Sequence, residues 1–214
     1  PRFVQGRRYT DDATLDIVEK VLATEVNHFL AAEFEKIGGR AMTLNFESTP
    51  VLKGEPLKLT DDDGNAVDLG HVGVVTSVDQ EMIESLSNAG KVPFIPSMAI
   101  TEDGYKLNVN ADTAATKVAQ ELNADKLVIL SDVPGVMKDP SDPESIVSSL
   151  NREQALQLIA DGTISAGMIP KVEACLETLD KGVRKVHIVD GNLRHSLLLE
   201  VYTSGGIGTV MYRK

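Results

Sequence analysis

The chain alternates between stretches with helical spacing of apolar residues and short apolar runs. The first helical stretch follows Thr10-Asp11-Asp12, which supply an N-cap and an acidic first turn, and the pattern resumes at 25–37 before Gly38-Gly39. Further helices are predicted over 80–88, 111–122, 151–160, 170–182 and around 197–199. Strands are predicted over 41–46, 72–78, 92–95, 127–130, 186–191 and 209–212.

This order of elements predicts the fold class. Strands that alternate with helices form a parallel or mostly parallel sheet covered by helices on both faces. The run 127–130 is apolar at every position, as expected of a strand buried on both sides, and 186–191 is predicted to be a second such strand. We therefore predict an α/β fold, a three-layer sandwich with a mostly parallel central sheet. Within the polar stretch 53–68, residues 61–65 predict the tip of a hairpin.

Charge and composition exclude several classes of partner. The 214 residues are 42% hydrophobic and carry 21 basic against 32 acidic side chains, a formal net charge of −11. A nucleic-acid-binding protein needs a basic surface, so no nucleic-acid partner is expected. No apolar run approaches the roughly 20 residues that cross a bilayer, so no membrane partner is expected either. A nucleotide ligand would need a local group of cations in so acidic a chain.

Cysteine and histidine usage indicate a reduced, metal-free protein. Cys175 is the single cysteine, which rules out an internal disulfide and fits a cytoplasmic location; its apolar neighbours predict a buried side chain. The four histidines, at 28, 71, 187 and 195, form no close pair with metal-ligand spacing. No metal bound by the protein itself is predicted.

The first candidate site is the segment Asn108-Val109-Asn110-Ala111-Asp112. In an extended segment, alternate side chains point to the same face, so Asn108, Asn110 and Asp112 would lie together. They would form a polar face that binds a small substrate. The alternative is that the asparagines end a strand and cap the alanine-rich helix that follows.

The second candidate site is Gly167-Met168-Ile169-Pro170-Lys171. Proline suits the first helical turn, so Lys171 would stand at a helix start, where backbone N–H groups favour phosphate. The alternative is an ordinary exposed lysine. In a parallel sheet, ligands bind beyond the carboxyl ends of the strands, which places Ser131-Asp132 and Asp190-Gly191 at the same rim as Lys171.

These motifs, in this order, make the chain resemble the N-acetylglutamate kinases of the amino acid kinase superfamily. The resemblance covers nearly the whole chain and rests on several segments. They are 6–11 (GRRYTD), 68–73 (DLGHVG), 108–115 (NVNADTAA), 131–136 (SDVPGV), 167–172 (GMIPKV), 187–191 (HIVDG) and 205–209 (GGIGT). Each is weak alone, and the set is specific.

The resemblance implies a reaction in which ATP, with Mg²⁺ carried by the nucleotide, phosphorylates the side-chain carboxylate of N-acetyl-L-glutamate in arginine biosynthesis. It implies that Arg8, Asn108 and Asn110 bind the amino acid and that Asp112 orients the catalytic lysines. Lys171 would be catalytic and would also bind the nucleotide. The remaining implied nucleotide-binding residues are Ser131, Asp132, Gly167 and Met168.

The same resemblance implies two lobes and a homo-oligomer. Residues 1–110 would be the remainder of an amino-terminal, amino-acid-binding lobe, and 111–214 a carboxyl-terminal, nucleotide-binding lobe. Relatives begin with a strand, a glycine-rich turn and a second phosphate-binding lysine, whereas this sequence opens at Pro1. We therefore expect a missing amino-terminal segment and little activity from these residues alone. The segment 43–48 also departs from the glycine-rich stretch of many relatives.

Two questions stay open at this stage. Another superfamily activity, such as that of an aspartate, glutamate or carbamate kinase, and a noncatalytic fragment that binds nucleotide or arginine are the alternatives. In addition, His187, Glu200 and Gly206 resemble the effector site of the arginine-inhibited kinases, since Glu200 suits a guanidinium and a glycine turn exposes carbonyls. The alternative there is an amphipathic helix with an exposed glutamate.

Overall fold

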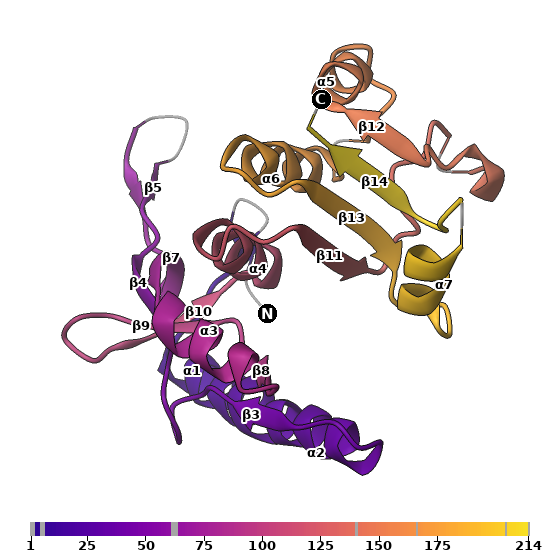
Figure 1. The fold of residues 1–214 in the computed structure, drawn as a ribbon. Coiled ribbons are helices and arrows are strands. Elements are labelled where there is room, and N and C mark those ends of the chain that lie inside the picture. The colour runs from indigo at the N-terminus through magenta and orange to yellow at the C-terminus, as the bar shows by residue number, and fades with distance from the viewer. Residues whose placement is uncertain are drawn as a thin grey trace. The chain divides into compact units, whose positions relative to one another are not determined.

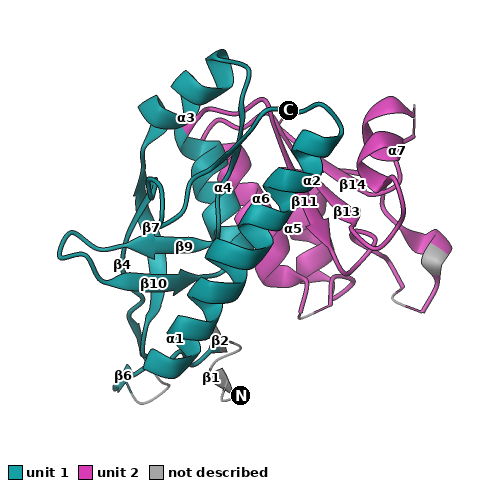
Figure 2. Cartoon of the chain, turned by 90° about the horizontal axis from the view of Figure 1, so that it is seen from below, with its two compact units in different colours: residues 1–121 teal, residues 122–214 magenta. Residues whose placement is uncertain are grey.

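The protein folds into two compact units, Pro1–Glu121 and Leu122–Lys214 (Figure 2). A computed structural model describes residues 3–4, 7–60, 64–139, 141–165, 167–203 and 205–213. The boundary falls after helix α4 (Ala111–Glu121), whereas the sequence predicted it before this helix. The reason is packing, because α4 lies against strand β7 (Val72–Val78) of unit 1.

Unit 1 is built around a closed ring of four strands, β10-β7-β4-β9. The other three strands of the ring are β4 (Leu52–Pro56), β9 (Met98–Ile100) and β10 (Lys106–Val109). β10 runs parallel to β7, while β4 runs antiparallel to β7 and β9 antiparallel to β10. One residue pair, Lys53 with Ile100, closes the ring.

Shorter strand pairs complete unit 1. They are β1 (Phe3–Val4) with β2 (Arg7–Arg8), β3 (Ala41–Thr43) with β8 (Val92–Phe94), and β5 (Leu59–Thr60) with β6 (Ala66–Val67). The antiparallel pairing of β5 and β6 confirms the predicted hairpin. Residues 61–63 of its predicted tip lie outside the described residues.

A long helical run flanks these strands in Figure 1. It consists of α1 (Asp12–Val18), the π-helical η1 (Glu19–Val26) and α2 (Asn27–Lys36), so the two predicted helices are joined. The side chain of Asp11 caps α1 by accepting a 2.8 Å hydrogen bond from the backbone N–H of Thr14. α3 (Gln80–Asn88) packs against β8. None of the helices in the described part of the chain is long and apolar enough to span a membrane.

Unit 2 contains a four-stranded sheet in the order β11-β13-β14-β12. The strands are β11 (Lys126–Ser131), β12 (Ser149–Asn151), β13 (Lys185–Asp190) and β14 (Thr209–Tyr212). The helices are α5 (Arg152–Ala160), α6 (Ile169–Asp180), α7 (Ser196–Tyr202) and the 3₁₀ turn η2 (Pro143–Ser145). α6 packs on β13 and β14, α7 on β13 and α5 on β12 (Figure 1).

The α/β class is confirmed, and the strand directions are mixed within it. β11 runs parallel to β13, and β12 parallel to β14, but β13 and β14 are antiparallel. Thr209 pairs with Ile188 near the carboxyl end of β13, so β14 starts beside the end of the strand that precedes it in the chain. Cys175 is fully buried with Val172 in the core of unit 2, which confirms the predicted burial of its side chain.

Candidate active site

Unit 1 has a cavity of about 430 Å³ that gathers three of the predicted substrate-binding residues. Arg8, Asn108 and Asn110 line it. The rest of the lining is the apolar residues Ile17, Val18, Val21, Leu22, Val72 and Val109. A polar group of one guanidinium and two amides therefore faces an apolar wall supplied by α1 and η1. Sequence reasoning missed that wall because its residues read as a helix face packed in a core, whereas Ile17 is 62% exposed.

Hydrogen bonds fix Asn108 next to Arg8. The Nδ2 of Asn108 donates to Thr10 Oγ1 at 3.1 Å, and the Thr10 hydroxyl donates to the backbone oxygen of Arg8 at 3.3 Å. Thr10 itself is fully buried, and its backbone bonds to Leu69 O and His71 N. The hydroxyl thus links the Asn108 side chain to the backbone of Arg8, two of the three polar residues that line the cavity.

Asn110 and Asp112 depart from the predicted geometry. The extended segment ends at Val109, and Asp112 lies in the first turn of α4, so the three side chains do not share one strand face as predicted. Asn110 explains the change, since its Oδ1 accepts from Thr113 N at 3.0 Å and so caps α4. Asn110 also lines the cavity, so the capping alternative and the binding hypothesis both apply to it.

Unit 2 has a cavity of about 360 Å³ that contains most of the predicted nucleotide-binding residues. Asp132, Gly167, Met168 and Lys171 line it, together with Val133, Gly135, Val136, Met137, Ile164 and Ser165. The sequence prediction missed the last six, although the Val133-Pro134-Gly135 turn soon after a predicted strand was a usable signal. That strand, β11, is not buried on both sides as predicted, since Leu130 is 56% exposed. Ser131 lies one residue before the cavity lining, at the end of β11, and bonds to Asp132 Oδ1 at 3.3 Å.

Lys171 stands in the first turn of α6, as predicted. Pro170 occupies the first helical turn, and the residue before the helix, Met168, makes no side-chain cap. The start of a helix carries partial positive charge, which favours an anion beside it. The cavity in unit 2 therefore combines apolar walls with a cation at a helix start. Asp112 belongs to unit 1, so its pairing with the catalytic lysines stays a prediction.

The rim predicted from parallel strands is present in unit 2. Ser131 pairs with Asp190 at the carboxyl ends of β11 and β13, and Gly191 N donates to Ser131 O at 2.7 Å. Asp132, the next residue after β11, lines the same cavity as Lys171.

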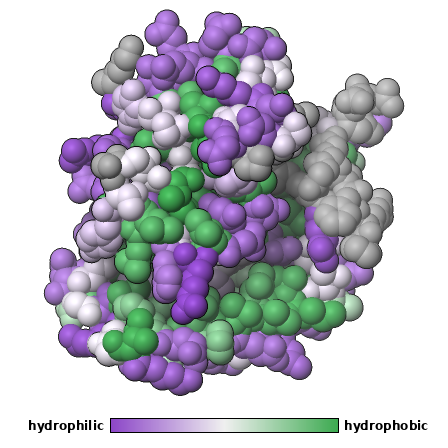
Figure 3. Space-filling view, turned by 90° about the vertical axis from the view of Figure 1, so that its right-hand side faces the viewer, coloured by the Kyte–Doolittle hydropathy of each residue, from purple (hydrophilic) through white to green (hydrophobic). Residues whose placement is uncertain are grey.

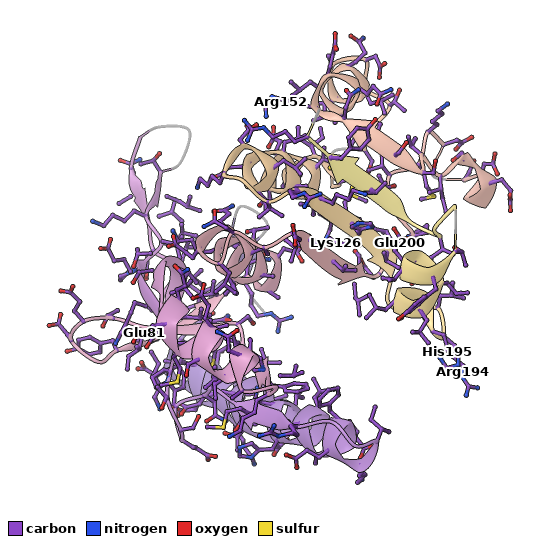
Figure 4. All side chains as sticks on the ribbon, viewed as in Figure 1. Glu81, Lys126, Arg152, Arg194, His195 and Glu200 are labelled. Carbon is purple, nitrogen blue, oxygen red and sulfur yellow. The ribbon has the colours of Figure 1, made fainter. Side chains whose placement is uncertain are left out.

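The three predicted effector residues also come together. His187 Nδ1 lies 2.6 Å from Glu200 Oε1, and a Cβ on Gly206 would lie 2.7 Å from Glu200 Oε2. Glu200, labelled on α7 in Figure 4, is buried, so the alternative of an exposed glutamate is wrong. Burial raises the pKa of its carboxyl, but hydrogen bonds from His187, Ile207 and Gly208 outweigh that effect and place the pKa below its usual value.

The donor set fits a nucleotide better than a metal held by the protein. In the described residues, no group of three or more His, Cys, Asp or Glu side chains could hold a metal ion. The cavity in unit 2 offers apolar walls suited to a base and a cation suited to phosphate.

Known proteins resemble this chain over its whole length. The model of the amino acid kinase family matches residues 1–190. Acetylglutamate kinase from Clostridium beijerinckii is 43% identical over 98% of this chain and 72% of its own length. Acetylglutamate kinase from Methanosphaera stadtmanae is 39% identical over 99% of this chain and 72% of its own length.

Solved structures show the same fold. N-acetylglutamate synthase from Neisseria gonorrhoeae, solved with coenzyme A and N-acetyl-glutamate, superposes with a TM-score of 0.86 at 24% identity. This chain is covered completely and spans 47%, about half, of that protein. With the family model and the two acetylglutamate kinases, the fold leads to one assignment: the chain belongs to the amino acid kinase family.

Proposed function

We propose that the protein is an acetylglutamate kinase, which transfers the γ-phosphoryl group of ATP to the side-chain carboxylate of N-acetyl-L-glutamate. The observation that carries this proposal is the cavity of unit 1, where Arg8, Asn108 and Asn110 meet an apolar wall. Relatives with that activity in their names are 39–43% identical over at least 98% of the chain. These findings favour the acetylated amino acid over the other substrates of the superfamily.

The proposed role of the unit 1 cavity is to bind and orient the amino acid. The Arg8 guanidinium suits a carboxylate, with which it can form two parallel hydrogen bonds. Because Asn108 Nδ2 donates to Thr10, its carbonyl oxygen can accept from the amide N–H of an acylated amino acid. The apolar residues of α1 and η1 would take the acetyl methyl group and exclude water.

The proposed role of the unit 2 cavity is to hold ATP. Val133, Val136 and Met137 would contact the base, and Lys171 at the start of α6 would neutralise charge on the phosphates. Asp112 would orient the catalytic lysines by ion pairing. Mg²⁺ carried by the nucleotide would offset the charge of the β- and γ-phosphates.

The reaction requires little covalent help from the protein. A carboxylate oxygen of the substrate bonds to the γ-phosphorus, the bond from that phosphorus to the β,γ-bridging oxygen breaks, and ADP leaves with the electron pair. The acceptor is already ionised, so no base has to remove a proton. Such a transfer depends on positioning and on stabilising charge, the two tasks assigned to Arg8, Asn108 and Lys171.

Arginine is the proposed feedback inhibitor, and His187, Glu200 and Gly206 are the proposed site. Glu200 Oε1 and Oε2 already accept hydrogen bonds from His187 and from two backbone N–H groups, so a guanidinium would have to share or replace them. His187 Nε2 is buried and finds no hydrogen-bond partner among the described residues. That orphaned atom supports a ligand or a neighbouring chain at this place.

The proposal includes a cytoplasmic enzyme of arginine biosynthesis that works as a homo-oligomer. The exposed apolar residues of the helical run 12–36 support self-association, since Phe29 is 61% exposed and Leu30 47% exposed. Figure 3 shows apolar patches among the polar residues of one face of the molecule.

A coupled ADP-release assay tests the function directly. The full-length protein with ATP and Mg²⁺ should turn over N-acetyl-L-glutamate at least about a hundredfold faster, by kcat/KM, than L-aspartate, L-glutamate or carbamate, since a site that hydrogen-bonds an acylated amide rejects ligands that leave its polar groups unpaired. Binding isotherms for ATP and N-acetylglutamate, compared with the ADP-release assay, separate a catalytic protein from one that only binds the two ligands. Binding of both ligands without ADP release would contradict the proposed activity.

A further inference from the structure

One wall of the unit 2 cavity is held in place from β14. Val136 N, in the loop after β11, donates a 2.8 Å hydrogen bond to the hydroxyl of Thr209, the first residue of β14. Both residues are buried, Val136 at 1% exposure and Thr209 at 0%. Gly135 and Val136 line the cavity, while Thr209 does not. The hydroxyl therefore acts on the cavity through the loop.

The loop approaches Thr209 too closely for any residue but glycine at position 135. Gly135 has φ +152°, and a Cβ built on it would lie 2.6 Å from Thr209 Oγ1 and 3.1 Å from Thr209 N. The loop is thus fixed by the hydrogen bond of Val136 and by the close contact of Gly135 with Thr209. Removal of the hydroxyl would leave the N–H of Val136 buried without this acceptor, which favours displacement of the loop.

Thr209 is in turn fixed from α7. Gly208 N and Ile207 N donate to Glu200 Oε2 at 3.0 and 2.8 Å, and Glu200 Oε1 lies 2.6 Å from His187 Nδ1 on β13. A Cβ on Gly208 would lie 2.2 Å from Ile188 O, so this segment also rests directly on β13. A continuous series of contacts thus runs from His187 through Glu200 and the 207–209 backbone to Val136.

We propose that Thr209 is a positioning residue of the nucleotide cavity, which sets the place of the Gly135–Val136 wall, and that Glu200 holds Thr209 in the orientation this requires. The inference rests on the proposed function, because it takes the nucleotide to be ATP. It assigns Glu200 a structural connection to the nucleotide cavity that does not depend on any effector.

The test compares Thr209→Val with Thr209→Ser in the full-length protein. The valine variant removes the hydroxyl and keeps the volume, so the ATP Kd measured by calorimetry should rise about tenfold. The KM for N-acetylglutamate should stay within about twofold, since the unit 1 cavity is untouched. The serine variant keeps the hydroxyl and should restore ATP binding. Unchanged ATP affinity in Thr209→Val would overturn the proposal.

Thr178→Val is the matched control, because Thr178 is also fully buried in unit 2 and its hydroxyl bonds to Ala174 O of its own helix at 2.7 Å. This variant should lower the melting temperature and leave the ATP Kd unchanged. An equal loss of ATP affinity in the control would show that Thr209 acts only through the stability of unit 2, and would overturn the positioning role.

Hydrogen exchange without any nucleotide separates this proposal from the proposed function. The amide of Val136 should exchange faster in Thr209→Val than in the wild type or in Thr178→Val. A wild-type protein that binds no ATP would end the proposed function, while Val136 exchange would still decide whether Thr209 holds the loop. Equal exchange in all three proteins would refute the contact.

A double-mutant cycle tests the link to Glu200. Glu200→Gln keeps the size of the side chain and removes its charge, so Gly208 and Ile207 lose part of their acceptor. If Glu200 acts through Thr209, the combined Thr209→Val and Glu200→Gln variant should raise the ATP Kd by less than the product of the two single effects. A combined effect equal to the product would overturn the Glu200 step.

Discussion

Lys171 should matter strongly for catalysis because the protein is so acidic. Because the chain has a net charge of −11, it repels the phosphates of ATP unless cations gather near them. We predict that Lys171→Ala lowers kcat by about 10²–10³, the usual cost of a lost transition-state donor, and changes the KM for N-acetylglutamate much less. Steady-state kinetics measure both constants.

Lys181→Ala is the control for that substitution. Lys181 lies at the opposite end of α6, where it pairs on the surface with Glu177 at 2.6 Å. An exposed pair of this kind contributes about 0–1 kcal/mol. An equal loss of kcat in the two variants would assign the effect of Lys171 to overall charge.

Arg8 and Asn108 should affect the amino acid and spare the nucleotide. A hydrogen bond to a charged group is worth about 1.5–3 kcal/mol, so Arg8→Ala should raise the KM for N-acetylglutamate by about 10- to 100-fold. Asn108→Ala should raise it as well, and ATP binding by calorimetry should stay nearly intact in both. Arg40→Ala, which removes an exposed bond to Ala89 O, is the control. Equal weakening of ATP binding would contradict the assignment.

Glu200 predicts how unit 2 responds to acid. Its folded pKa lies below the ordinary value of 4.5, so its contribution to stability is complete above that value and disappears as the pH falls through the lowered one. Urea titrations from pH 6 to 3 should therefore show a steeper acid loss of stability in the wild type than in Glu200→Gln. Glu173→Gln, exposed on α6, should follow the wild type. Identical slopes in all three proteins would remove Glu200 from the acid response.

At the scale of elements, the start of α4 combines capping with binding. Asn110→Asp keeps the oxygen that accepts from Thr113 N, whereas Asn110→Ala loses it. The alanine variant should therefore lose about 1 kcal/mol of stability, as is typical for an N-cap, and the aspartate variant should not. If Asn110 also binds the substrate through Nδ2, both variants should raise the KM for N-acetylglutamate. A raised KM in the alanine variant alone would leave Asn110 as a cap.

The elements that the sequence predicted are those with a regular pattern and clear ends. β7, β13 and α3 have the predicted bounds within a residue or two, because their apolar spacing is regular and Asp79 caps α3. β4, β9 and β12 were missed, since they are short and their stability comes from pairing with distant strands. β4 even contains Gly54, where a Cβ would lie 2.6 Å from Val74 O.

The site was predicted where the chemistry is local and missed where it depends on packing. Lys171 at a helix start follows from a proline and a glycine nearby in the chain. The apolar wall of the unit 1 cavity and the Thr209 contact do not, because they join residues that are far apart in sequence. Val136 and Thr209, for example, are 73 positions apart. No local pattern identifies such a pair.

At the scale of the whole molecule, each unit has its own core and a candidate ligand cavity. Leu44, Leu52 and Ala99 are buried in unit 1, and Val172, Ile188 and Met211 in unit 2. The polar and apolar lining of one cavity suits an acylated amino acid, and that of the other suits ATP. Each ligand should therefore stabilise its own unit first, since a ligand stabilises the structure to which it binds.

Hydrogen exchange of the full-length protein tests whether each ligand binds to its own unit. ATP with Mg²⁺ should slow exchange at 132–137 and 164–171, where the unit 2 cavity is lined, and N-acetyl-L-glutamate should slow it at 8–22 and 106–110 of unit 1. Local opening governs exchange, so a bound ligand protects the segments that it contacts. Lys171→Ala should weaken the first pattern and leave the second, and Arg8→Ala should do the reverse. If ATP slowed exchange in unit 1 and left exchange in unit 2 unchanged, the assignment of amino-acid and nucleotide binding to separate units would be contradicted.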